Sequence, residues 1–148
     1  MGDWVNPADT HDYVLPEHRP LAVPPGTAED VAKAATEENA RRAAARVVFR
    51  LRVLTDSEYA AVQDSYRVHV GTRGADDAGV SFRAGTMNLL LLRYGLRGWD
   101  GPGAPAFKAD ADGRPTSDTL SRLPSRWRQD LANAIDHLCA FGPDAVKA

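Results

Sequence analysis

Residues 87–107 read MNLLLLRYGLRGWDGPGAPAF, residues 120–138 read LSRLPSRWRQDLANAIDHL, and together these two stretches decide the fold. Both carry apolar residues at the spacing of one helix face. Between them lie Gly98 and Trp99, followed by turn-forming Gly and Pro residues. We therefore predict two helices that flank a tight Gly–Trp corner. No polar group in this segment is placed to do chemistry, so the pattern of the segment indicates packing and not catalysis.

The first predicted helix is apolar on two sides. One stripe, at i, i+3, i+4 and i+7, consists of Met87, Leu90, Leu91 and Tyr94. The opposite stripe consists of Leu89, Leu92 and Leu96. Such a helix must be covered on both sides, and Gly95 favours the close approach of another element. We expect Gly98 to end the helix and Trp99 to fold back on its last turn.

The second predicted helix begins near Pro124, after a turn over residues 118–123, and ends at Gly142. Cys139 is the only cysteine of the chain, and we interpret it as a small core residue rather than a nucleophile. Residues 143–148 are predicted to be a frayed tail. The core stripe of this helix consists of Trp127, Leu131, Ala134, Ile135 and Leu138.

Residues 1–26 are predicted to form an extended arm, because prolines occur in it too densely for a helix interior. Apolar residues, including Trp4 and Tyr13, lie along this arm. Exposed aromatic rings would be unfavourable in a free monomer. The arm therefore either packs back on the domain or reaches a partner.

A helix is predicted from residue 28 to about residue 45, with Thr27 and Asp30 as a weak capping pair. The stretch is rich in Ala, Glu and Arg, which are strong helix formers. Glu38 stands four residues before Arg42, the favourable order for an ion pair on a helix. Because the apolar face is mostly alanine, we expect a helix that is solvated or faces a partner.

Residues 46–54 alternate between apolar and polar, which predicts a half-buried strand. The polar face carries Arg46, Arg50 and Arg52, which we interpret as solvated, with phosphate or an acidic partner as the alternative ligand. Thr55 to Glu58 form a complete capping box for a helix that runs to about residue 65. Residues 66–70 and 80–82 are candidate strands on either side of a loop over residues 71–79.

These elements predict an α+β fold that is mainly helical, with a small antiparallel β-sheet and an extended N-terminal arm. Residues 27–142 would form a single domain, which suits a chain of 148 residues. The net charge of −2 argues against a dedicated nucleic-acid binder, and 43% hydrophobic residues is ordinary for a soluble protein. The longest aliphatic run, residues 89–92, is far shorter than a bilayer span.

We expect no catalytic, metal-binding or cofactor-binding site. A calcium loop aligned on Gly113 would need carboxylates where Lys108 and Thr119 stand. The four histidines do not occur at ligand spacing. Neither a phosphate-binding Gly-rich loop nor a nucleophile elbow is present. The sequence therefore predicts a protein that is not an enzyme.

Four patterns occur in order between about residues 45 and 140. They are Arg-x-Leu-Thr at 52–55, a helix with Glu-Tyr and Gln-Asp at 58–64, a Leu-rich helix closing on Gly-Leu-x-Gly-Trp at 89–99, and Leu-Pro…Leu-x-x-x-Ile at 123–135. In this order they resemble small tail-region proteins of tailed double-stranded DNA phages.

The resemblance implies a tail assembly chaperone-like protein, which binds the tape-measure helix, recruits tail-tube subunits and is not an enzyme. It would act in the host cytoplasm, away from membranes, in a homo-oligomer or a hetero-complex. A virion structural protein of the tail or neck, with its arm packed on neighbouring subunits, is the alternative. A regulatory nucleic-acid binder that uses the three strand arginines is a third class. The expected partner contacts are Trp4, Tyr13, Tyr94, Trp99 and Trp127.

Overall fold

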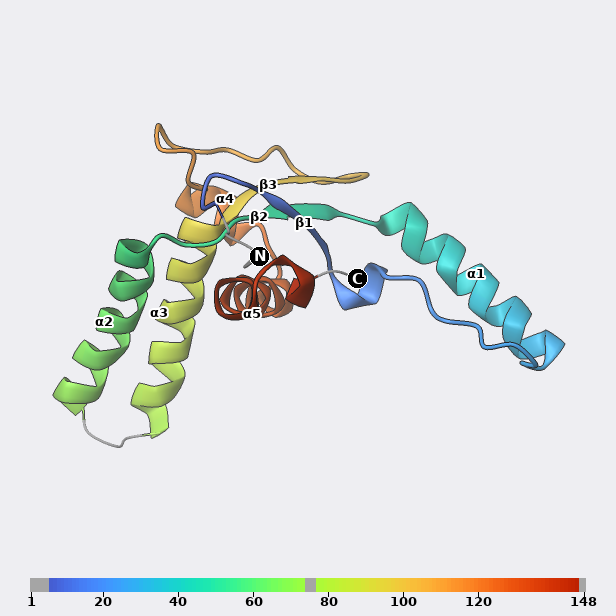
Figure 1. The fold of residues 1–148 in the computed structure, drawn as a ribbon, viewed down its shortest axis with the longest axis horizontal. Coiled ribbons are helices and arrows are strands. Elements are labelled where there is room, and N and C mark those ends of the chain that lie inside the picture. Colours follow the sequence, from blue (N-terminus) through green and yellow to red (C-terminus); the bar gives the residue numbers. More distant parts are fainter. Residues whose placement is uncertain (1–5, 74–76, 147–148) are drawn as a thin grey trace, which may run out of the picture.

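The structure is a computed structural model that describes residues 6–73 and 77–146. Within residues 66–84 it describes the backbone of the helices but not the side chains. This part of the chain has a mainly helical α+β fold with a three-stranded antiparallel sheet, which confirms the predicted fold class (Figure 1). The elements are β1 (His11–Val14), the 3-10 turn η1 (Pro16–His18), α1 (Glu29–Ala45), β2 (Val48–Leu51), α2 (Asp56–Arg73), α3 (Asp77–Gly95), β3 (Leu96–Asp100), α4 (Ser117–Ser121), α5 (Ser125–Phe141) and the 3-10 turn η2 (Pro143–Val146).

The sheet has β2 at its centre, with β1 and β3 on its two sides. Tyr13, Phe49 and Trp99 stand opposite one another across the three strands. Because β1 lies within the first 26 residues and Leu15 after it is fully buried, this part of the predicted arm packs back on the domain. That outcome is the first of the two alternatives for the arm.

The candidate strands at residues 66–70 and 80–82 are wrong, because both segments are helical. The helix α2 continues to Arg73, α3 begins at Asp77, and the two helices lie side by side as an antiparallel pair (Figure 1). An alternation of three to five residues cannot by itself be told from part of a helix. Of the predicted loop 71–79, residues 74–76 lie outside the described residues.

The predicted Gly–Trp corner is also wrong. The helix α3 ends at Gly95, and the chain continues directly as β3, whose backbone pairs with β2. Residues 96–100 therefore pair in the sheet, although Gly98 was expected to end a helix there. Trp99 does not fold back on α3; it is buried in β3, opposite Phe49.

The close approach predicted at Gly95 is confirmed. A Cβ atom built on Gly95 would lie 2.5 Å from Cγ2 of Ile135 in α5, far inside normal contact distance. The Gly95 carbonyl also accepts a hydrogen bond from the backbone N–H of Arg52, at 2.8 Å. One glycine thus joins the end of α3 both to α5 and to the end of β2.

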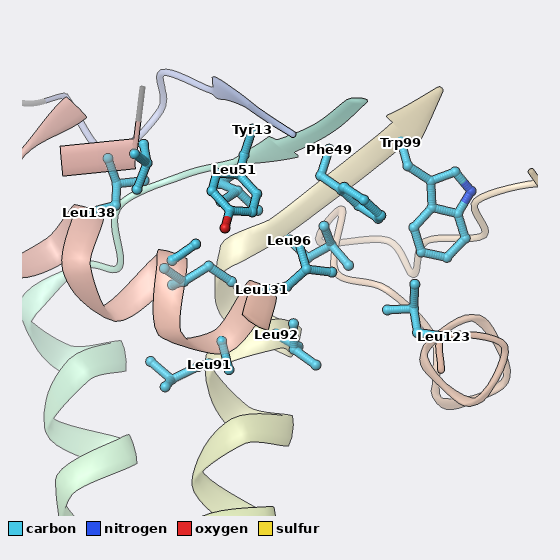
Figure 2. Packing of buried hydrophobic residues seen from close by; sticks show 14 of the residues in the cluster. Tyr13, Phe49, Leu51, Leu91, Leu92, Leu96, Trp99, Leu123, Leu131 and Leu138 are labelled. Carbon is cyan, nitrogen blue, oxygen red and sulfur yellow. The ribbon is translucent and has the colours of Figure 1, made fainter. Parts of the chain in front are cut away.

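The core lies between the inner face of the sheet, α5 and the last turns of α3 (Figure 2). The predicted α5 stripe is confirmed, since Leu131, Ile135 and Leu138 are buried and Trp127 packs at its edge. The second stripe of α3 is only partly covered. Its Leu92 and Leu96 are fully buried, whereas Leu89 is 45% exposed.

The helix ends agree with the sequence in α5 but not in α1. Pro124 precedes α5, and Gly142, at φ +83°, ends it as predicted. The residue that caps α1 is Ala28, because the Thr27 hydroxyl donates to the Pro24 carbonyl instead. Residues 143–146 are not frayed, because they form η2 and bury Val146.

The capping box at Thr55 is confirmed in both directions. The Thr55 N–H donates to Glu58 Oε1 at 2.9 Å, and the Glu58 N–H donates to Thr55 Oγ1 at 3.3 Å. The second carboxylate oxygen of Glu58 accepts from Arg52 Nη2 at 2.5 Å. Burial by itself would raise the pKa of Glu58, but the hydrogen bonds from Arg52 and Thr55 outweigh it and hold that pKa below its ordinary value.

The prediction that Arg52 lies on a solvated strand face is wrong. Arg52 lies just beyond the end of β2, and its side chain is buried against Glu58 of α2. A partner supplied by the next helix leaves no mark on the apolar–polar pattern of the strand.

We expect Gly95→Ala to destabilise the protein by about 1–3 kcal/mol, because the added methyl group would overlap Ile135. Gly85→Ala in the same helix is the matched control, since a Cβ there meets nothing within 4 Å. That control should be neutral or should stabilise α3 by about 0.5–1 kcal/mol. Urea unfolding followed by circular dichroism measures both, and equal effects of the two changes would contradict the packing described at Gly95.

We expect Glu58→Gln to lower the free energy of unfolding by about 1–3 kcal/mol at pH 7. The depressed pKa of Glu58 means that its contribution is present above the unfolded-state pKa and disappears as pH falls through the folded-state pKa. The variant should therefore lose less stability than the wild type between pH 7 and pH 3. Asp56→Asn, an exposed acid in the same turn, is the control. An acid-induced loss equal to that of the wild type in Glu58→Gln would count against this pairing.

Candidate partner-binding surface

An apolar cavity with aromatic walls lies at the foot of α1, where the start of β2, the end of β3 and the first turn of α5 meet. We call it the aromatic pocket, and its volume is about 420 Å³. Ala45, the last residue of α1, stands at its edge, so the pocket and the helix form one continuous surface. The main apolar lining residues are Phe49, Trp99, Pro102, Pro105, Leu123 and Trp127.

Edge-to-face contacts hold the rings of the pocket in place. The Phe49 ring centroid lies 6.2 Å from that of Trp99 and 6.1 Å from that of Trp127, both nearly perpendicular. His18 meets Trp127 in the same way at 5.4 Å. The Trp99 indole donates to the Pro105 carbonyl at 2.6 Å, so its polar atom is satisfied and its ring presents an apolar surface. Such a wall is pre-formed for an apolar group.

The helix α1 projects away from the sheet and α5, with the chain segment before it running alongside (Figure 1). We call residues 19–45 the α1 lobe. No residue of α1 is buried. The segment is held by polar contacts, in which Asn39 bonds both backbone groups of Leu21 and Arg42 donates to the Arg19 carbonyl. Its exposed apolar side chains are Leu21, Val23 and Val31.

The α1 lobe has no hydrophobic core of its own. An isolated helix of this length is marginally stable in water, and its stability in proteins comes chiefly from packing an apolar face. Val31 is 56% exposed on a helix whose charged residues include the Glu38–Arg42 ion pair. The interpretation of this helix as solvated or partner-facing fits these features.

The predicted partner contacts are not gathered at one place. Trp99 and Trp127 both line the aromatic pocket, although Trp99 is 5% exposed. Tyr13 is a buried core residue with the Arg19 guanidinium 5.1 Å from its ring centroid. Tyr94 is half-buried beneath Arg114. Trp4 lies outside the described residues, and the role of all five as partner contacts stays a prediction.

The strand arginines are also dispersed. Arg46 is exposed, Arg50 forms an ion pair with Asp100 across the sheet, and Arg52 is buried against Glu58. Two of the three arginines are thus paired with carboxylates, and only Arg46 is exposed. The nucleic-acid alternative stays a prediction, with fewer unpaired guanidinium groups on this strand than the sequence indicated.

The side chains with possible chemistry have structural roles. The Asp110 carboxylate accepts the backbone N–H groups of Asp112 and Arg114, which builds the polar turn expected there. Within residues 6–73 and 77–146, no group of three or more His, Cys, Asp or Glu could hold a metal ion. In the same ranges, no helix is long and apolar enough to span a bilayer.

Cys139 packs against the core and its Sγ accepts the Leu54 N–H at 3.4 Å. Burial raises the pKa of this thiol above its ordinary value. The thiolate is the nucleophilic form of cysteine, so this environment suppresses reactivity. The interpretation of Cys139 as a packing residue accords with both features.

No protein family, curated protein or solved structure gave a match to this chain.

Sequence reasoning missed the pocket itself. Trp99 was named from the corner after one predicted helix and Trp127 from a second helix, whereas the structure joins them through Phe49, which the pattern assigned to a strand. The signal that could have linked them is the proline-rich stretch after Trp99. Pro102 and Pro105 complete the pocket wall, and the Trp99 indole donates to the Pro105 carbonyl.

We expect the Cys139 thiol to react with a disulfide reagent at pH 8 at least about tenfold more slowly in the folded protein than in urea, because its thiolate form is disfavoured by burial. Absorbance of the released chromophore measures the rate. The same protein in urea is the control for the intrinsic reactivity of the thiol. A folded-state rate equal to the unfolded-state rate would mean that Cys139 is an accessible nucleophile.

Proposed function

We propose that this protein is a non-enzymatic assembly factor of phage tails, similar to tail assembly chaperones, that holds an apolar segment of another tail protein. Two independent lines support the proposal. The four ordered patterns between about residues 45 and 140 supply the phage-tail class. The single structural observation that carries a binding role is the aromatic pocket at the foot of an α1 lobe without a core.

The pocket suits one side of an apolar helix or strand. Its walls are rigid rings and prolines, and aromatic pockets of this kind provide most of the binding energy at protein interfaces. A bound segment that leaves the pocket past Ala45 would run along α1 and could cover Val31. The expected occupant is an apolar helical segment of the tape-measure protein, in the helix-in-groove manner.

The second candidate is a structural protein of the tail or neck that stays in the virion. The α1 lobe favours it, because a projecting helix with exposed Leu21, Val23 and Val31 can pack on a neighbouring subunit. Mass spectrometry of purified particles separates the two candidates. An assembly chaperone should be missing from mature particles, whereas a structural protein should be present in multiple copies.

Co-expression with a tape-measure protein from the same genome, followed by affinity purification, tests the proposal. We expect the tape-measure protein to be retained, and Trp127→Ala to weaken binding by about 30-fold, since truncating an aromatic anchor costs about 2 kcal/mol or more. Pro102→Glu, which places a charge at the pocket rim without removing core atoms, should weaken it as well.

Phe141→Ala is the control, because Phe141 is 75% exposed and lies outside the pocket lining. It should leave retention unchanged. If wild-type protein retains no tape-measure or tail-tube protein, the assembly-factor proposal fails. If it retains one of them but all three variants behave alike, the aromatic pocket is not the binding site.

A further inference from the structure

A second cleft, of about 680 Å³, is separate from the aromatic pocket, since the two share no lining residue. It is open and rich in arginine. Arg52, Arg97 and Arg114 line it together with a single acid, Glu58. The hydroxyl residues Thr10, Thr55 and Ser57 complete the polar lining. Three guanidinium groups face one carboxylate, so the lining carries an excess of two positive charges.

The one carboxylate is already engaged. Glu58 accepts from Arg52 at 2.5 Å and from the Thr55 N–H at 2.9 Å, and Arg114 Nη2 stands 3.6 Å away. Its oxygens therefore serve the α2 cap and the buried pair.

Arg97 forms no ion pair in the described part of the chain. Its Nη1 donates to the Asp112 backbone carbonyl at 3.0 Å, and among the described residues no carboxylate lies within 4.0 Å of it. Burial, reinforced by the charges of Arg52 and Arg114, lowers the pKa of Arg97 from its ordinary value, although the charges of Glu58 and Asp110 act in the opposite direction. Asp112 does approach Arg114, at 4.0 Å, but its side chain is 75% exposed and screened by water.

Arg114 is held so that it faces the cleft. Its guanidinium lies over the Tyr94 ring, 4.9 Å from the centroid, and Arg114 Nε is buried without a hydrogen-bond partner among the described residues. Arg52 Nε is likewise buried and unpartnered in the described part of the chain. The buried Nε atoms and the Tyr94 ring hold the guanidinium planes of Arg52 and Arg114 in place, and fixed guanidinium planes are the arrangement that recognises oxyanions.

We infer that this cleft binds an oxyanion, the carboxylate or phosphate group of a ligand, between Arg97 and Arg114. An anion there would balance the excess positive charge and accept hydrogen bonds from both guanidinium groups. Hydroxyls of Thr10 and Ser57 lie on the same lining and can donate to the remaining oxygens. This inference does not depend on the proposed function, because it uses neither the aromatic pocket nor the α1 lobe.

Titration of the full-length protein with inorganic phosphate and, separately, with succinate tests the inference. Side-chain Nε–Hε resonances of arginine, followed by NMR at constant ionic strength with chloride as the reference salt, report binding at each guanidinium. We expect saturable shifts confined to Arg97, Arg114 and Arg52. The stronger of the two titrations identifies phosphate or carboxylate as the preferred group.

Arg97→Gln should weaken binding by about tenfold or more, because it removes a charge-assisted hydrogen bond. Arg46→Gln, which removes the same charge from an exposed arginine outside the cleft, should leave the dissociation constant unchanged. Arg97→Lys, which keeps the charge, should give an intermediate value and guards against misfolding of the glutamine variant. Shifts that do not saturate, that spread equally over exposed arginines, or that are the same in Arg97→Gln and Arg46→Gln would overturn the inference.

Discussion

The contact of Gly95 with Ile135 is the constraint on which the rest of the structure depends. Because no side chain separates them, α3 can end against α5 and pass into β3 without a linker. The Gly95 carbonyl then receives the Arg52 N–H, which fixes the end of β2. Arg52 in turn reaches Glu58, the residue that caps α2. Helix packing, sheet register and a helix cap are therefore coupled through one residue without a side chain.

The elements with a long, regular pattern could be predicted from sequence, and those that depend on distant partners could not. The α5 stripe and the Thr55 capping box are encoded locally, within one or two helical turns. The β3 strand forms because it pairs with β2, which lies far away in the chain. Local sequence alone therefore suggested that Gly98 and Trp99 lie at the end of a helix. The short alternations near Val68 and Phe82 failed for a related reason, because the packing of α2 on α3 decides their state.

The candidate site follows the same division. Aromatic residues with an apolar setting, such as Trp127, could be singled out from sequence, but their meeting with Phe49 requires the fold. Arg52 looked like a surface charge because the strand alternation does not show that Glu58 of the next helix pairs with it. The arginine cleft was invisible for this reason, since Arg52, Arg97 and Arg114 come from three separate segments. Charged residues that come together from distant segments produce no periodic pattern in the sequence from which their proximity could be predicted.

The position of α5 after all three strands has a consequence for synthesis on the ribosome. The three strands have all been made once Asp100 has been translated, yet α5, which covers the inner face of their sheet, comes later. Until then the core around Phe49, Leu51 and Leu96 lacks the side chains of α5. A nascent chain that stalls before residue 125 would expose the apolar face of the sheet. It should therefore bind ribosome-associated holdases, and truncated products should aggregate rather than accumulate as soluble protein.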